Sequence, residues 1–178
     1  MNSRLDVLLK IDRKIFHTQD LALLWEISNR NTLYTTIKRY VQRGILIPIQ
    51  KGLYATISLE KLNPQKLGLS LVHNYTYIST ETVLFEEGVI LQMPECITLV
   101  SAKSMKISLG GQSYLVRKMR DKFLYQNEGV VEKNGFRKTT LERAIADMLY
   151  FNPRYYFDEK DFINWKKGAE IQKRVGFK

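Results

Sequence analysis

Residues 29–57 read NRNTLYTTIKRYVQRGILIPIQKGLYATI, and this stretch decides the expected fold. Its first half begins with polar turn and capping residues, and apolar residues then recur at helical spacing through residues 33–41. Gly44 follows as a residue that commonly ends a helix. We therefore predict a helix over residues 31–43.

The second half of the stretch has the pattern of a β-hairpin. Two short β segments, 45–49 and 53–57, flank a turn at Lys51 and Gly52. Pro48 has no amide donor, so we expect its strand to lie at the exposed edge of a small sheet.

Two shorter helical patterns precede this stretch. The first covers about residues 3–13, and the second begins at Thr18, which we expect to act as its N-cap, and ends near Ile27. Two helices joined by a short polar turn make a helix-turn-helix. With the following hairpin as a wing, residues 1–60 are predicted to form a winged helix-turn-helix domain.

The charge of this segment is of one sign. The chain carries 28 Lys and Arg against 18 Asp and Glu, a formal net charge of +10, which favours anionic partners. Between Ile27 and Leu59 there is no acidic residue. A solvated helix face usually mixes both signs, so we interpret this run as a phosphate-facing surface and keep the solvated face as the alternative. Its basic residues are Arg30, Lys38, Arg39, Arg43 and Lys51.

A helical projection of residues 31–43 separates an apolar side from a polar one. The polar side carries the types of side chain that read base edges in the major groove of duplex DNA: Thr35, Lys38, Arg39 and Gln42. We expect phosphate contacts from Arg30, Arg43 and Lys51. The remaining candidate contacts are Asn31, Thr32, Tyr34 and Gly52.

Residues 61–178 have a different pattern of predicted helices and strands, and we place the domain boundary between Ser58 and Asn74. Gly110 and Gly111 separate two β patterns, a strong hairpin signal. We predict an α+β protein in which a smaller C-terminal domain combines an antiparallel sheet with flanking helices. The predicted strands are 97–101, 105–109, 112–119, 123–126, 130–132 and 136–138. The predicted helices are 64–72, 79–85, 141–151 (capped by Thr140) and 159–175.

Three motifs, in this order, resemble those of one family. Residues 43–46 (RGIL) with 51–55 (KGLYA) look like the "RGLL…RGLYA" signature of AbiEi-type antitoxins, which are also described as transcriptional regulators of bacterial viral defence systems. Residues 77–84 (YISTETVL) are similar to the family's "YISLESAL" segment, and 140–149 (TLERAIADML) to its "TPEKALLDLL" helix. The resemblance covers roughly residues 16–151.

The resemblance implies a repressor that binds the inverted repeats of its own operator. It also implies an antitoxin, with residues 61–178 as the antitoxin domain, that opposes a co-encoded nucleotidyltransferase-type toxin in a type IV toxin-antitoxin system without requiring a stable complex. The proline and lysine of the family's helix motif are Leu141 and Arg143 here. Glu142 and Asp147 on that helix are expected to lie on a solvated face or to pair with Arg143 or a neighbouring strand, and partner binding is the alternative.

A second basic cluster follows the Gly110–Gly111 hairpin. Three interpretations stay open: an extension of the DNA footprint, a docking surface for an acidic partner, or lysines and arginines that protect an exposed edge strand from aggregation. The cluster consists of Arg117, Lys118, Arg120 and Lys122.

The sequence argues against enzymatic chemistry. It contains no glycine-rich phosphate loop, no paired-histidine metal motif and no GxSxG elbow, and His17 and His73 have no nucleophile at a suggestive spacing. Cys96 is interpreted as a small buried hydrophobe, and the usual Cys and His zinc sites cannot be assembled. We expect no metal, no cofactor, no small-molecule substrate and no membrane contact, and we expect a cytoplasmic protein.

Two other functions compete with the repressor and antitoxin. The first is an adaptor whose winged helix docks its basic face onto an acidic protein surface. The second is an orphan transcriptional regulator that has no toxin.

Overall fold

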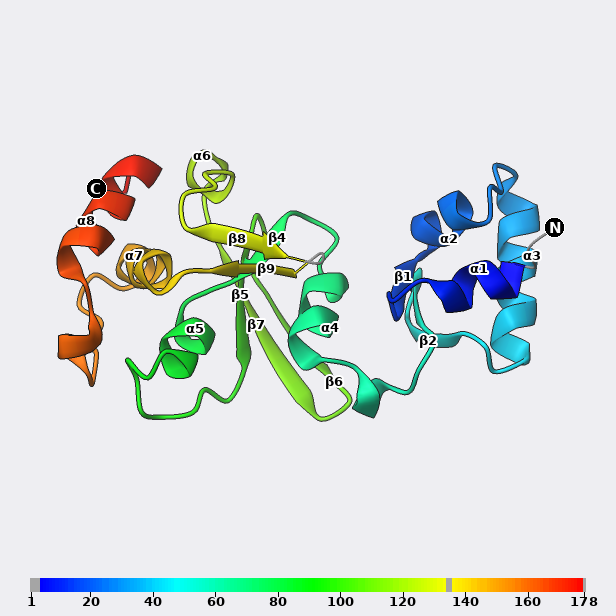
Figure 1. Cartoon of the computed structure of the whole chain (residues 1–178), viewed down its shortest axis with the longest axis horizontal. Helices are drawn as coiled ribbons and strands as arrows, with labels where there is room; N and C mark the ends of the chain where they lie inside the picture. The colour runs from blue at the N-terminus through cyan, green and yellow to red at the C-terminus, as the bar shows by residue number, and fades with distance from the viewer. Residues whose placement is uncertain (1–3, 134–135, 178) are drawn as a thin grey trace. The chain divides into compact units, whose positions relative to one another are not determined.

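The computed structural model describes residues 4–133 and 136–177, and the chain divides into two compact units, Met1–Asn63 and Pro64–Lys178 (Figure 1). Both contain helices and a sheet, so the fold is α+β. The elements of the N-terminal unit are α1 (Arg4–Lys10), β1 (Ile15–His17), α2 (Thr18–Leu24), α3 (Arg30–Gln42), β2 (Ile47–Gln50), β3 (Leu53–Ala55) and the 3₁₀ turn η1 (Leu59–Lys61).

Capping interactions at both ends determine where helix α3 begins and ends. The Asn29 side chain accepts a hydrogen bond from the Thr32 amide (3.0 Å) and so satisfies a free donor of the first turn. At the other end Gly44 has φ +69°, and the Ile45 amide donates back to the Tyr40 carbonyl (2.9 Å). This is the Schellman arrangement, in which a glycine ends the helix at no steric cost. The glycine stop predicted from the sequence is confirmed.

The core of the N-terminal unit collects apolar side chains from α1, β1, α2 and α3. Phe16 and Leu21 are almost fully buried, and Trp25 packs on Tyr40 of α3 with ring centroids 5.0 Å apart. The buried members of this core are Leu8, Phe16, Leu21, Trp25, Ile27, Leu33, Ile37 and Leu46. The inner side of α3 is therefore fixed by packing, and its outer side is free of the core.

The sheet of this unit has three antiparallel strands in the order β1-β3-β2. Strand β1 was not predicted from the sequence. Strand β2 is an edge strand and its Pro48 is exposed, which confirms the predicted place of that proline.

The first two helices differ from their predicted bounds. Helix α1 ends at Lys10 instead of residue 13, and α2 ends at Leu24 instead of Ile27. The predicted cap of α2 is wrong by one residue: His17 is the N-cap, and its amide donates to the Asp20 carboxylate (2.7 Å). The reason is that β1 runs directly into α2, so the strand's last residue becomes the cap.

The C-terminal unit is the larger of the two, which corrects the expectation of a smaller second domain. Its helices are α4 (Pro64–Leu71), α5 (Glu81–Glu86), α6 (Asp121–Leu124), α7 (Leu141–Phe151), the 3₁₀ turn η2 (Lys160–Phe162) and α8 (Trp165–Val175). Its strands are β4 (Thr76–Ile78), β5 (Ile97–Ser101), β6 (Met105–Leu109), β7 (Gln112–Lys118), β8 (Val130–Lys133) and β9 (Phe136–Thr139).

The sheet of this unit is mixed, with six strands in the order β6-β7-β5-β4-β9-β8, so the expected antiparallel sheet is wrong. The predicted hairpin β6–β7 is present, but β7 folds back between β6 and β5 and runs parallel to β5. Strands β4 and β9 are also parallel. Parallel pairing joins strands that are distant in sequence, which local patterns do not report.

Helix α4 packs against β4, β5 and β9. Gly68 allows this close approach, because a Cβ atom there would lie 2.6 Å from the Tyr114 ring. Figure 1 shows α7 beside α8 at the end of the unit where the chain terminates. A separate core joins Tyr77 and Val100 of the sheet to Phe123 of α6 and Ala146 of α7.

Three elements of this unit differ from the sequence prediction. Residues 123–126 were predicted as a strand, yet the short helix α6 ends at Leu124 and buries Phe123 and Leu124. The helix predicted over 79–85 begins at Glu81, with Thr80 as its N-cap, and the Ser79 hydroxyl before it donates to Asp147. The last predicted helix, 159–175, is divided into η2 and α8, because Asn164 caps a new start. Thr140 caps α7 as predicted.

No helix within the described residues is long and apolar enough to cross a membrane.

Candidate nucleic-acid interface

The outer face of α3 presents every side chain predicted to read bases. Thr35, Lys38, Arg39 and Gln42 are exposed or partly exposed, whereas Leu33, Thr36 and Ile37 on the inner face are buried. The buried Thr36 was not foreseen; its hydroxyl donates to the Thr32 carbonyl (2.8 Å), which satisfies it inside the helix. The remaining predicted contacts are also exposed, apart from the half-buried Gly52: Arg30, Asn31, Thr32, Tyr34, Arg43 and Lys51.

The first turn of α3 is organised by local contacts. The Asn29 side chain also accepts from the Thr32 hydroxyl (3.3 Å), so these two side chains are engaged in capping. The Arg30 guanidinium carbon lies 5.7 Å from the centroid of the exposed Tyr34 ring. This cation–π contact holds the Arg30 charge beside the helix start.

The tip of the β2–β3 hairpin is tied to the start of α2. Gly52 has φ +79°, and its carbonyl accepts from the Thr18 amide (2.9 Å) and hydroxyl (3.3 Å). Lys51 at the same tip is exposed. The tip is therefore held in place while its lysine stays in solvent. Tyr54 of β3 is half-buried and packs against the core.

The basic side chains of this face are not neutralised within the unit. Among the described residues of the N-terminal unit, the ion pair formed is Arg13–Asp20, which lies outside α3 and the hairpin. Lys38, Arg39 and Lys51 take part in no ion pair there. The unit thus has a fixed helix and a tethered hairpin whose exposed Lys38, Arg39 and Lys51 form no ion pair within residues 4–63.

The second basic cluster is divided by the structure. Arg117 is half-buried, pairs with Glu81 and lies 5.6 Å from the Phe151 ring, so it belongs to the packing of the C-terminal unit. Strand β7 lies between β6 and β5, so the interpretation as an exposed edge strand is wrong. Lys118, Arg120 and Lys122 are exposed.

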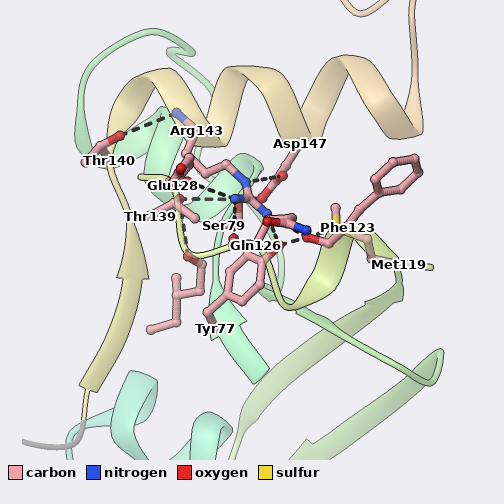
Figure 2. A network of polar contacts seen from close by, with 11 residues as sticks. Tyr77, Ser79, Met119, Phe123, Gln126, Glu128, Thr139, Thr140, Arg143 and Asp147 are labelled. Carbon is pink, nitrogen blue, oxygen red and sulfur yellow. Dashed lines mark hydrogen bonds and ion pairs between the residues drawn. The ribbon is translucent and has the colours of Figure 1, made fainter. Parts of the chain in front are cut away.

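A buried polar network occupies the centre of the C-terminal unit (Figure 2). Arg143 and Asp147 of α7 form an ion pair (2.8 Å) with neither side chain exposed, so the expected pairing of Asp147 with Arg143 is confirmed and a solvated position for Asp147 is wrong. Two further hydrogen bonds join them to strand β4 and the residue after it: Arg143 donates to the Tyr77 hydroxyl (2.9 Å), and the Ser79 hydroxyl donates to Asp147 (2.8 Å).

The same arginine fixes the loop after α6. Its Nη1 donates to the carbonyls of Gln126 and Glu128, both at 2.8 Å. Gly129 passes so close that a Cβ there would lie 2.6 Å from the Cβ of Arg143. A sequence pattern does not show which backbone carbonyls of another segment will accept hydrogen bonds from an arginine. The burial of Arg143 was therefore not predicted.

Burial dominates the electrostatics of this network. It raises the pKa of Asp147 above its ordinary value, with the Arg143 guanidinium and the Ser79 hydroxyl acting in the opposite direction. Burial and the Asp147 charge likewise raise the pKa of Tyr77. None of the four residues of the network is accessible to solvent: Tyr77, Ser79, Arg143 and Asp147. The network therefore offers no surface to a substrate, and its role is to stabilise the fold.

The candidate ligands and nucleophiles considered in the sequence are dispersed. Within the described residues no three His, Cys, Asp or Glu side chains gather as a metal site. His17 is the N-cap of α2, and Cys96 is half-buried instead of fully buried.

A scan against models of protein families and a search of curated proteins each find no match for this chain.

Proposed function

We propose that the N-terminal unit is a winged helix-turn-helix that binds duplex DNA, with α3 in the major groove and the β2–β3 hairpin as the wing. One observation carries this proposal: the outer face of α3 is exposed and basic and its Lys38 and Arg39 form no ion pair with the described residues, while its inner face is fixed in the core. A recognition helix needs this combination, because base readout requires rigid placement and free donors.

The exposed side chains divide into candidates for base contacts and candidates for phosphate contacts. Lys38, Arg39 and Gln42 supply donors for guanine and adenine edges, and the Thr35 methyl suits thymine. In this proposal Arg30 at the helix start and Lys51 at the hairpin tip, both exposed, contact phosphates. Phosphate contacts set the register on the duplex, and base contacts supply the sequence preference.

We further propose that the chain represses its own operon through operator inverted repeats and counteracts a co-encoded nucleotidyltransferase-type toxin. The resemblance of residues 43–55, 77–84 and 140–149 to AbiEi-type antitoxins supports this role. Expression of a neighbouring nucleotidyltransferase gene with and without this chain tests it. Growth arrest that this chain relieves is the expected result, and arrest that persists would contradict the antitoxin role.

The DNA proposal is tested with the full chain and the duplex from its own upstream region. Arg39→Ala should reduce affinity for the operator by about 1–3 kcal/mol and leave non-operator binding nearly unchanged. Lys51→Ala should weaken both duplexes alike and lower the slope of log K against log salt by about 0.9. Lys166→Ala, an exposed lysine of α8, is the matched control and should change neither.

Two results would overturn the proposal. One is the absence of duplex binding at low salt. The other is an equal effect of Arg39→Ala and Lys166→Ala, because binding would then follow net charge and not the face of α3.

A further inference from the structure

Several strands of the C-terminal unit place their ends together at one side of its sheet. β4 begins where its antiparallel neighbour β5 ends, at the pair Thr76–Ser101. β7 is parallel to β5, so it also ends there, at Lys118, which is aligned with Ser101. β9 is parallel to β4 and begins there with Phe136 and Arg137. The topology thus gathers segments that are far apart in the sequence.

Two tyrosine rings lie against each other at this end. Tyr75, just before β4, and Tyr125, just after α6, have ring centroids 5.3 Å apart at 50°. The Tyr75 hydroxyl donates to Asn127 (3.1 Å), and the Arg137 guanidinium carbon lies 4.9 Å from its ring centroid. Tyr75 is therefore held at its hydroxyl and at its ring, and its ring packs on Tyr125, which is 54% exposed.

The segment leading to Tyr125 is basic. Lys118, Arg120 and Lys122 are exposed and take part in no ion pair among the described residues, and Asp121 is the acid between them. Lys122 is three residues before Tyr125 in the chain, and its ammonium lies 4.5 Å from the centroid of the Phe123 ring. The exposed Tyr125 thus closely follows, along the chain, three exposed cations that form no ion pair with any residue the structure describes.

We propose that this surface, formed by Tyr75, Tyr125, Lys118, Arg120 and Lys122, binds single-stranded nucleic acid. An unstacked base packs on the exposed face of Tyr125, and the three cations contact the phosphates on either side. A duplex does not fit this chemistry, because its bases are already stacked and cannot reach a tyrosine ring. The surface is therefore distinct from α3, which presents donors for the groove of a duplex.

Fluorescence anisotropy of the full chain with a labelled oligouridylate of about ten nucleotides, which does not pair with itself, tests the proposal. Tyr125→Leu keeps an apolar side chain beside Tyr75 but removes the ring, and it should raise Kd by about fivefold to a hundredfold. Tyr125→Phe keeps the ring and should bind like the unmodified chain. Tyr156→Leu is the matched control, since Tyr156 is also exposed and its ring centroid lies 4.7 Å from the Lys160 ammonium.

Two further variants separate this surface from α3. Arg120→Ala combined with Lys122→Ala should lower the salt slope for the oligouridylate by about 0.7 for each phosphate that is no longer bound. Arg39→Ala should leave oligouridylate binding unchanged even if it abolishes duplex binding. The proposal is overturned if Tyr125→Leu binds as tightly as Tyr125→Phe, if Arg39→Ala removes oligouridylate binding, or if Tyr125→Leu weakens duplex binding equally.

Discussion

Replacing Asp147 with alanine removes the carboxylate that balances the buried charge of Arg143. Oδ1 of Asp147 accepts from the Arg143 Nε (2.8 Å), and its Oδ2 accepts from the Ser79 hydroxyl (2.8 Å). The guanidinium stays in place after the substitution, because the Gln126 and Glu128 carbonyls still hold it. A cation therefore remains inside the protein without a counter-charge.

The expected cost follows from that geometry. Breaking a buried ion pair by removing one partner costs about 3–5 kcal/mol, since neither Arg143 nor Asp147 is exposed. With a urea dependence of roughly 2 kcal/mol per molar, the unfolding midpoint of the C-terminal unit should fall by about 1.5–2.5 M. Ser79→Ala removes one hydrogen bond to the same carboxylate and should cost about 1.5–3 kcal/mol.

The chain offers one tryptophan for each unit. Trp25 is buried in the N-terminal core, and Trp165 begins α8, where its ring lies 5.9 Å from Phe157. Trp25→Phe leaves fluorescence that reports the C-terminal unit, and Trp165→Phe leaves fluorescence that reports the N-terminal unit. In these two backgrounds Asp147→Ala should shift the Trp165 transition and leave the Trp25 transition where it was.

Two outcomes would refute this reasoning. An unchanged Trp165 midpoint would mean that the buried pair contributes little to the fold. An equal shift at both tryptophans would mean that the two units unfold as one, so that the cost could not be assigned to the C-terminal network.

Three further predictions concern single side chains. Gly52→Ala should lower the Trp25 urea midpoint by the equivalent of roughly 1–2 kcal/mol, because φ is +79° there and the new Cβ would lie 3.4 Å from the Thr18 hydroxyl. The hydrogen bond from Lys167 holds the pKa of Glu142 below its usual 4.5, so its stabilisation is present above that pH and lost as the pH falls through the lowered pKa. Glu142→Gln should therefore cost roughly 0.5 kcal/mol near pH 7 and nothing in strong acid, as compared by urea unfolding at both pH values. Burial raises the pKa of Tyr114 to about 12, so folded Tyr114 keeps its proton where the unfolded chain loses it, and stability should fall as the pH rises above about 10. Urea midpoints across that range should fall less steeply for Tyr114→Phe.

The parts of the fold that local chemistry determines could be predicted from the sequence. Helix α3 was recognised from its apolar spacing and from Gly44, and the structure shows both. The same holds for α7 with its Thr140 cap and for the β6–β7 hairpin at two glycines. In each case the residues that fix the geometry are within a few positions of one another.

The parts of the fold that depend on residues distant in the sequence could not be predicted in this way. Strand β1 has three residues and exists because it pairs with β3, about forty residues later, so it leaves no periodic pattern of its own. In residues 123–126 the apolar side chains suggested a strand, but burial against Tyr77 and α7 selects a helical turn. For the candidate interface, exposure of the α3 face followed from the helical projection, whereas the link between Thr18 and Gly52 did not.

The buried network also limits where the residues responsible for the proposed antitoxin role can lie. Two of the segments that resemble the AbiEi-type family meet in this network. Tyr77 and Ser79 come from residues 77–84, and Arg143 and Asp147 come from residues 140–149. All four are buried, so packing alone accounts for their residue types, and none can touch a toxin or its substrate in the folded protein. Any activity of the C-terminal unit against a partner must therefore come from exposed side chains outside these four positions. The surface around Tyr125 is one such place, and its variants change none of these four buried residues.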